Sequence, residues 1–206
     1  MRLLLDHSHT NPNIQNHSGV GPLLLAAKCQ DNGLAKMFLA PEKINPNITD
    51  YNGRTPSALA VYFRIHRVFR MLPEHADVNI AISDNDGRMR VSFAAVTGYH
   101  RLMTRRLLMS QKDAHPNKRD NNCKTPLIRA AESGNNAMIE ILLQQDDIIL
   151  EDSDNDGRTA VSWAAQKEHI LILRILLARR RACADKADNY GKTPLEWAAE
   201  RGMMQW

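Results

Sequence analysis

Two short segments carry side chains of the type and spacing that metal chemistry requires. Asp152-Ser153-Asp154-Asn155-Asp156-Gly157 matches the first six positions of an EF-hand calcium loop, but position twelve falls on Trp163 instead of a bidentate glutamate. His7 and His9 could face one metal ion, yet no third ligand follows at a fixed spacing. We therefore interpret the acidic segment as a structural turn and the histidines as part of a solvated loop, and we predict no metal site.

Motifs typical of catalysis are missing from the sequence. It contains no glycine-rich phosphate loop, no HExxH and no GxSxG, and its 8 histidines share no spacing. Cys29, Cys123 and Cys183 are odd in number and far apart, which argues against a disulfide framework and a paired-cysteine zinc site and favours a reducing compartment. These observations predict no catalytic residue, no cofactor and no small-molecule substrate, in an intracellular protein that is cytoplasmic rather than nuclear.

Charge and hydropathy argue against two further classes of partner. The 206 residues include 27 Lys and Arg and 23 Asp and Glu, and the small positive excess is spread over both halves. A nucleic-acid-binding protein concentrates its basic residues on one face or in one segment, so nucleic acid is disfavoured as a partner. No apolar stretch approaches the roughly 20 residues of a membrane-spanning helix, so we expect no membrane partner.

The elements that would position a site follow from an internal repeat. Six positions recur at spacings of 34, 34, 36, 34 and 34 residues, and they hold Gly19, Gly53, Gly87, Cys123, Gly157 and Gly191. Three copies continue into a Thr-Pro pair, at 55–56, 125–126 and 193–194. Apolar pairs such as Leu142-Leu143 and Leu176-Leu177 keep nearly the same period, so two independent features establish the repeat.

Each copy predicts two helices and a hairpin. A threonine such as Thr125 is suited to cap a helix, because its hydroxyl accepts a hydrogen bond from the first turn, and the following proline suits the first helical position. A small Ala-Ala pair lets a neighbouring helix approach closely. A second helix follows, as at 137–143 and 170–177, and then a polar turn in which glycine supplies a conformation that other residues adopt only with strain.

A unit of two helices that opens on D-x-x-G-x-T-P-L-x-x-A-A resembles the ankyrin repeat. The resemblance covers nearly the whole chain, and 157–165, which reads Gly-Arg-Thr-x-x-Ser-Trp-Ala-Ala, is similar to the long ankyrin arrays of filamentous fungi. It implies an all-α fold, an ankyrin-repeat solenoid of stacked helix–turn–helix units with connecting hairpin loops. Repeat three departs most, with Met89-Arg90 in place of Thr-Pro and two extra residues.

We expect a single ankyrin array over 1–206. Its parts are a partial repeat at 1–15, full repeats at 16–49, 50–83, 84–119, 120–153 and 154–187, and a partial repeat at 188–206. Terminal units of a solenoid usually present a polar outer face, but neither end shows one: 2–5 reads Arg-Leu-Leu-Leu, as in a second helix, and 203–206 is apolar. We therefore expect the sequence to be a piece of a longer array or the product of a truncated gene model.

The resemblance implies a non-catalytic protein–protein interaction module that binds a partner on its concave helix and hairpin surface. Ankyrin proteins typically contact partners through the two residues before the glycine position, the one after it, and the two after Ala-Ala. The implied contact residues are Tyr51, Asn52, Arg54, Tyr62, Asn85, Asp86, Arg88, Asn121, Asn122, Lys124, Asn155, Asp156, Arg158, Lys167, Asn189, Tyr190 and Lys192. Phe63 also lies at such a position, but we favour a place in the core for it.

The cations after the glycine position form a row if the units stack regularly: Arg54, Arg88, Lys124, Arg158 and Lys192. One hypothesis is that this cationic row, with nearby tyrosines, receives an acidic segment of a protein partner. The other is that the cations only pair with aspartates of the hairpins, and the sequence leaves both open. Alternative functions are a sensor or scaffold part of a larger signalling protein, similar to an immune-type receptor, and a nucleic-acid reader. An enzyme would require a catalytic domain that the repeats leave no room for.

Overall fold

The computed structural model describes residues 7, 9–29, 31–39, 44–72, 78–79, 81–98, 115–179 and 182–202. The terminal segments 2–5 and 203–206 lie outside these residues. The chain divides into two compact units, Met1–Arg90 and Val91–Trp206, which we call unit 1 and unit 2. None of the helices in the described ranges has the length and apolarity that crossing a bilayer requires.

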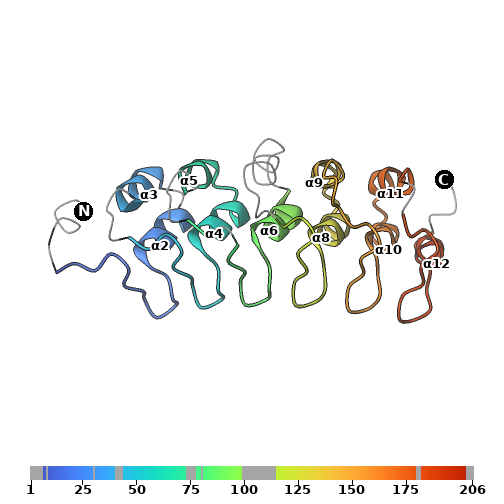
Figure 1. Cartoon of the computed structure of the whole chain (residues 1–206), viewed down its shortest axis with the longest axis horizontal. Helices are drawn as coiled ribbons and strands as arrows, with labels where there is room; N and C mark the ends of the chain where they lie inside the picture. Colours follow the sequence, from blue (N-terminus) through green and yellow to red (C-terminus); the bar gives the residue numbers. More distant parts are fainter. Residues whose placement is uncertain are drawn as a thin grey trace. The chain divides into compact units, whose positions relative to one another are not determined.

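Unit 1 contains two helical pairs. The inner helices α2 (Pro22–Lys28) and α4 (Pro56–Tyr62) contact each other, and each contacts the outer helix that follows it, α3 (Asn32–Leu39) or α5 (His66–Met71). The outer helices also contact each other, so the unit has two layers (Figure 1). A hairpin loop precedes α4 and extends from the inner layer on the side away from the outer helices.

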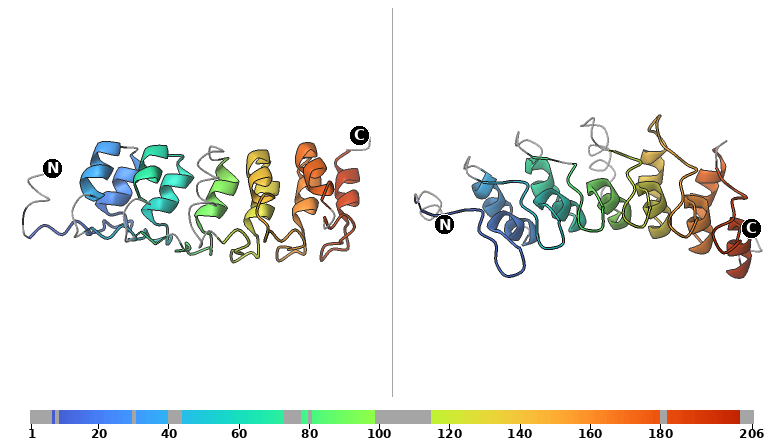
Figure 2. Two further views of the ribbon diagram at one scale, coloured as in Figure 1. Left: turned by 45° about the horizontal axis from the view of Figure 1, so that its top comes forward. Right: turned by 60° about the horizontal axis from the view of Figure 1, so that its bottom comes forward.

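Unit 2 repeats the same arrangement. The helices among its described residues are α6 (Arg90–Thr97), which begins at the last residue of unit 1, α8 (Pro126–Ser133), α9 (Asn136–Leu142), α10 (Ala160–Gln166), α11 (Ile170–Leu177) and α12 (Pro194–Glu200). Inner helix α10 contacts α8 and α12 on its two sides, and outer helices α9 and α11 contact each other above them (Figures 1 and 2). The second helices predicted at 137–143 and 170–177 are confirmed as α9 and α11.

The inner helices begin as the sequence predicts. The hydroxyl oxygens of Thr55, Thr125 and Thr193 each accept a hydrogen bond from the backbone N–H three residues later, and a proline follows each threonine. Helix α10 has no proline after its cap residue Thr159, but Thr159 and Ser162 form a capping box. The backbone N–H of Ser162 donates to Thr159 Oγ1 at 3.2 Å, and the backbone N–H of Thr159 donates to Ser162 Oγ at 3.3 Å.

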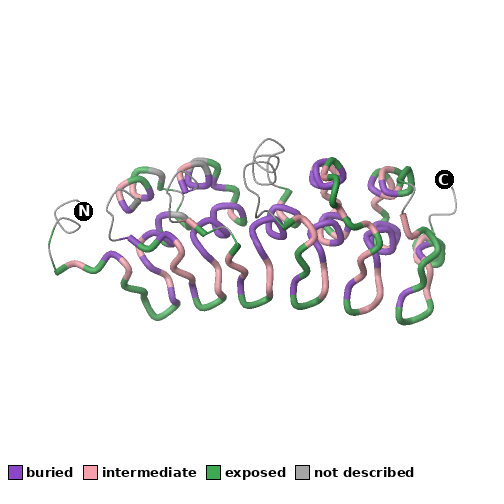
Figure 3. Tube along the Cα trace, viewed as in Figure 1, coloured by how far each residue is buried: buried purple, intermediate pink, exposed green. Residues whose placement is uncertain are grey.

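The core lies between the two helical layers of each unit. The alanine pairs of α6, α8 and α10 are fully buried, which lets neighbouring inner helices approach closely, and the outer helices add Ile139, Leu142 and Ile172. Figure 3 shows the inner helices α4, α8 and α10 as largely buried, and the hairpin tips and α12 as largely exposed. The only β pairing in the described residues is an isolated bridge between Ser153 and Thr159. The predicted all-α class is therefore confirmed, while the individual repeat boundaries stay a prediction.

Candidate protein-binding surface

A buried aspartate shapes five of the hairpins: Asp50, Asp84, Asp120, Asp154 and Asp188. In the fifth repeat, Asp154 Oδ1 accepts hydrogen bonds from the backbone N–H groups of Asp156 at 3.0 Å and Arg158 at 2.9 Å. The backbone N–H of Gly157 then donates to the Asp154 carbonyl at 2.9 Å, which closes the turn. The side chain of Asp152 contacts Arg119. The carboxylates of Asp152 and Asp154 therefore bind groups of the protein itself. This agrees with the interpretation of 152–157 as a structural turn.

The second oxygen of the aspartate has a different partner in each unit. In unit 1 it accepts from the cation after the glycine position: Arg54 Nε donates to Asp50 Oδ2 at 2.9 Å. Arg88 donates to Asp84 Oδ2 through Nε at 2.9 Å and through Nη2 at 2.7 Å. Two members of the predicted cationic row thus pair with hairpin aspartates in unit 1, and each pair is partly shielded from water.

In unit 2 the same oxygen accepts from the first turn of the inner helix. Arg129 Nε donates to Asp120 Oδ2 at 2.8 Å, Trp163 Nε1 to Asp154 Oδ2 at 2.8 Å, and Trp197 Nε1 to Asp188 Oδ2 at 2.9 Å. Each donor lies nine residues after its aspartate. A buried carboxylate is stable only when its oxygens are hydrogen-bonded, so these donors contribute to the stability of the hairpins.

The cations after the glycine position take further partners in unit 2, where Arg158 keeps a looser ion pair with Asp154, with Nε 3.5 Å from Oδ2. Lys124 Nζ lies 2.8 Å from Glu132 and 3.9 Å from the centroid of the Trp163 ring. The Arg158 guanidinium is 4.0 Å from the same centroid and contacts Asp156. The Lys167 ammonium lies 5.7 Å from the centroid, so three cations surround one indole at cation–π distances.

In the sixth repeat the cation after the glycine position also lies over a tryptophan ring and pairs with a glutamate. Lys192 Nζ lies 4.4 Å from the Trp197 ring centroid and 2.5 Å from Glu200. Burial alone would raise the pKa of Asp188, but hydrogen bonds from the backbone of Lys192, the Trp197 indole and the backbone of Tyr190 hold that pKa below its ordinary value. Asp188 is therefore charged at neutral pH, and its hydrogen bonds stabilise the hairpin until the pH falls through this lowered pKa.

Sequence reasoning did not identify the residue nine positions after the aspartate as part of the hairpin. The signal was present in the residue types. Leu59 and Phe93 occupy this position in repeats two and three and carry no donor, whereas Arg129, Trp163 and Trp197 occupy it in repeats four to six. An N–H donor at this position accompanies the change of partner at the aspartate.

The asparagines predicted as partner contacts link neighbouring hairpins. Within unit 1, Asn85 donates its backbone N–H to Asn52 O at 2.9 Å and its amide to Tyr51 O at 2.7 Å. Within unit 2, the Asn155 backbone N–H donates to Asn122 O at 3.1 Å, and the Asn189 amide donates to Asn155 O at 2.9 Å. These bonds join residues about one repeat apart, so the asparagines hold the hairpins in register. A contact between these asparagines and a partner stays a prediction.

Three tyrosines remain prominent on the surface. Tyr51 is 66% exposed, Tyr62 is 43% exposed and Tyr190 is 69% exposed. Tyr62 meets the half-buried Phe63 edge to face, with ring centroids 5.1 Å apart. Lys167 is also exposed, and within the described residues no ion pair engages it. These side chains combine exposure with a fixed backbone, which suits contact with a partner.

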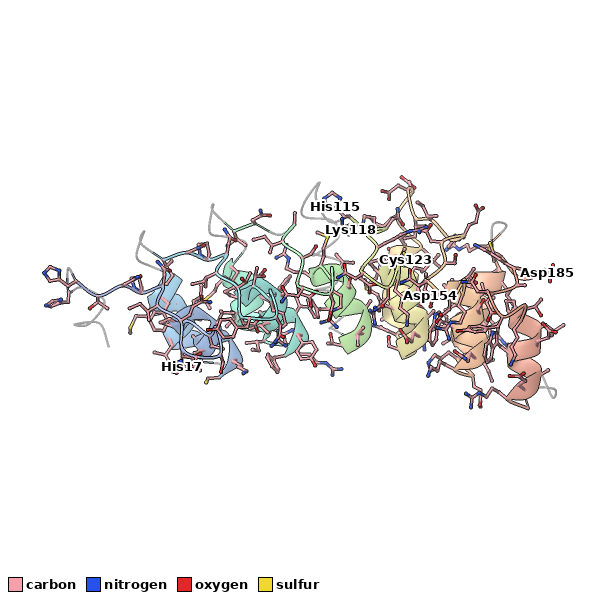
Figure 4. All side chains as sticks on the ribbon, turned by 90° about the horizontal axis from the view of Figure 1, so that it is seen from below. His17, His115, Lys118, Cys123, Asp154 and Asp185 are labelled. Atoms are coloured by element: carbon pink, nitrogen blue, oxygen red, sulfur yellow. The ribbon has the colours of Figure 1, made fainter. Side chains whose placement is uncertain are left out.

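Cys123 occupies the glycine position of the fourth hairpin (Figure 4). Its φ of 58° is in the left-handed region, and its counterpart Gly157 has φ 79°. A side chain at this φ is strained, so the fourth hairpin carries a conformational cost that the fifth does not.

The rings of His7 and His9 lie 5.7 Å apart, and the described part of the chain contains no group of three metal-ligating side chains.

Helical pairs joined by aspartate-closed hairpins define a solenoid-type helical repeat protein. The family model for ankyrin repeats matches three times, over 65–152, 91–187 and 146–205. The chain belongs to the ankyrin repeat family. Ankyrin repeat domains generally mediate protein–protein interaction, and proteins of this family are typically non-catalytic interaction modules.

Solved structures agree on the fold. The ankyrin repeat protein EF0377 is 22% identical with a TM-score of 0.76, and the match covers 91% of this chain and 94% of that one. The ankyrin repeat domain of Bcl-3, a member of the IkappaB protein family, is 22% identical with a TM-score of 0.78, and the match covers 96% of this chain and 86% of that one. None of the curated proteins compared with the chain matches it. At this identity the two structures show a shared fold, and the similarity to fungal arrays stays a prediction.

Proposed function

We propose that this chain is a non-catalytic module that binds a protein partner on the surface formed by its inner helices and hairpin tips. The observation that carries the proposal is the exposure of Tyr51, Tyr62 and Tyr190 at sites whose backbone is held by hairpin and helix hydrogen bonds. Tyrosine is enriched among the residues that dominate binding energy, because it combines a large rigid ring with a polar tip.

Tyr51 supports the proposal through the way its ring is held. A Cβ added at Gly19 would lie 2.6 Å from Tyr51 Cδ1 and 2.6 Å from Tyr51 N, so the tyrosine packs closely on the preceding hairpin. Gly19 has φ 70°, which also favours glycine there. A ring that is ordered before binding loses less conformational freedom when a partner covers it.

The finer part of the proposal is that an acidic segment of the partner binds in unit 2. Lys167 is exposed beside Trp163, and Lys192 is about one third exposed beside Trp197. A carboxylate of the partner would contact Lys167 directly and compete with Glu200 for Lys192. Because such charges are close to water, we expect binding to weaken as the salt concentration rises. In unit 1, by contrast, Arg54 and Arg88 pair with buried aspartates, and the tyrosines would provide the contact.

The test places a photo-cross-linking amino acid at one position at a time. At Tyr51, Tyr62 and Tyr190 we expect discrete protein adducts in a cell extract, and at Arg174 and Leu177, exposed on outer helix α11, we expect none of these adducts. The same adducts at the α11 positions, or no adduct at any tyrosine, would contradict the proposal.

Matched variants then measure affinity for the cross-linked partner. Y62A and K167E should each weaken binding by about tenfold or more, whereas R174A should leave it unchanged. A glutamate-rich peptide tested by fluorescence anisotropy examines the acidic segment separately. If the peptide does not bind while the cross-linked partner still binds through the tyrosines, only the proposal of an acidic segment in unit 2 is refuted.

A further inference from the structure

The first turn of α6 lacks the threonine cap that opens α4, α8, α10 and α12. Repeats three and five align closely here, because Met89-Arg90-Val91-Ser92 occupies the place of Thr159-Ala160-Val161-Ser162. The two four-residue segments differ only in their first two residues. Met89 and Arg90 are therefore the two residues of this segment that set the start of α6 apart from the start of α10.

Met89 cannot supply the cap that Thr159 supplies. Thr159 and Ser162 exchange two hydrogen bonds that satisfy N–H groups at the start of α10. A methionine side chain has no oxygen to accept such a bond, and loss of a cap typically weakens the first turn of a helix. Ser92, the counterpart of Ser162, is present and buried, so the second half of a capping box is in place without its partner.

Arg90 adds an electrostatic cost at the same point. It is 4% exposed, and its Nη1 has no hydrogen-bond partner within the described part of the chain. Burial lowers the pKa of Arg90 to about 10, so the guanidinium is still charged at neutral pH. A cation at the first position of a helix also faces the positive end of the helix dipole. A buried, incompletely bonded cation is among the most destabilising arrangements in a protein interior.

The division between the two units falls at this point, since unit 1 ends at Arg90 and unit 2 begins at Val91. In a solenoid the stability is approximately a sum of the stability of each repeat and of the contacts between neighbours. A repeat with a poorly stabilised first helix therefore reduces the cooperativity between the repeats before it and after it.

We propose that the uncapped start of α6, with its buried Arg90, is a built-in weak point at which the array opens, so that unit 1 and unit 2 unfold in separate steps. The opening begins at the first turn of α6 and precedes the loss of the hairpins in unit 2, whose inner helices α8, α10 and α12 all have threonine caps. This conformational device is independent of the proposed binding surface.

The sequence provides probes that separate the two units. All 3 tryptophans, Trp163, Trp197 and Trp206, lie in unit 2, so tryptophan fluorescence follows unit 2 alone, whereas far-UV circular dichroism follows the helices of both units. In urea we expect the wild-type circular dichroism curve to show an earlier transition that the fluorescence curve lacks. Coincident curves for the wild-type chain would overturn the proposal.

The variant M89T/R90A makes residues 89–92 identical to 159–162. We expect it to bring the two curves together and to slow hydrogen exchange of the α6 amides by about tenfold or more. R90A alone should give part of this effect, because it removes the buried cation and keeps the buried Met89 side chain. Unchanged α6 exchange in both variants would overturn the proposal.

The reciprocal variant T159M/A160R is the matched control. It transfers the first turn of repeat three into repeat five, so we expect α10 to exchange faster and the fluorescence transition to shift to lower urea, with the earlier circular dichroism transition unchanged. If this variant does not fold, T159M alone gives the same comparison for the cap. Unchanged α10 exchange in the folded variant would show that these two residues do not create a weak point.

Discussion

The hairpins of unit 1 and unit 2 have the same turn but different chemistry at its base. In both units the aspartate closes the turn with one oxygen, as Asp84 does with two backbone N–H groups and Asp154 does with its own pair. The second oxygen binds an arginine of the hairpin itself in unit 1, and a side chain of the following helix in unit 2. The same aspartate-closed turn therefore occurs with an arginine of the hairpin on the second oxygen in unit 1 and with a helix side chain on it in unit 2.

In this comparison the partner of the hairpin cation varies with the residue type at one helix position. Where the position nine residues after the aspartate holds no donor, the hairpin arginine supplies the missing hydrogen bonds and is retained by the carboxylate. Where it holds a tryptophan, the indole N–H donates to the oxygen and the cation lies over the ring, as Arg158 does over Trp163 while its Nε stays 3.5 Å from Asp154 Oδ2. The surface charge available to a partner thus depends on a buried side chain.

The largest expected difference between the units comes from removing the aspartate. D154A leaves the indole N–H of Trp163 and two backbone N–H groups without their acceptor, and Trp163 is only 6% exposed, so water cannot replace that acceptor easily. We expect a loss of about 3 kcal/mol in the free energy of unfolding. D84A should cost about 2 kcal/mol, since Arg88 can turn toward water. Urea denaturation measures both, and an equal or larger cost for D84A would contradict the comparison.

A smaller effect is expected when the indole donor alone is removed. W163F keeps an aromatic ring but deletes the N–H, which gives repeat five the residue type that Phe93 provides in repeat three. We expect Arg158 Nε, now 3.5 Å from Asp154 Oδ2, to approach hydrogen-bonding distance, at a net cost of about 1 kcal/mol. The Nε–H resonance of Arg158 in a nitrogen-15 spectrum reports the change. An unshifted resonance would show that the helix residue does not control the cation.

An effect of similar size, but stabilising, is expected at the glycine position, where unit 2 has Cys123 and unit 1 has only glycines. C123G should stabilise the fourth hairpin by about 1 kcal/mol, because glycine adopts φ near 60° without strain, and Arg119 keeps its contact with Asp152. Thermal unfolding of unit 2, followed by tryptophan fluorescence, measures the gain.

The opposite change provides the control. G157A should destabilise unit 2, since φ is 79° and the new Cβ would lie 2.6 Å from Asn189 Oδ1. A neutral result for both substitutions would mean that the backbone conformation at this position contributes nothing to the difference between hairpins four and five.

The sequence by itself determined the features that depend on neighbouring residues. The helix starts at Thr55, Thr125 and Thr193, the glycine positions with positive φ and the order of inner and outer helices were all predicted correctly. Each is governed by interactions within a few residues along the chain, such as a cap or the absence of a Cβ. The family followed from the period of these local signals.

Only the tertiary structure decided which side chains meet across the hairpins and helices. The sequence left open whether the cations pair with hairpin acids, and the structure shows that Arg54 and Arg88 pair with buried aspartates whereas Lys124 pairs with Glu132 over the ring of Trp163. It also shows that Asn85 and Asn189 link hairpins 34 residues apart. These contacts depend on how closely packed repeats bring side chains together that are distant along the chain, and interactions within a few residues do not specify that packing.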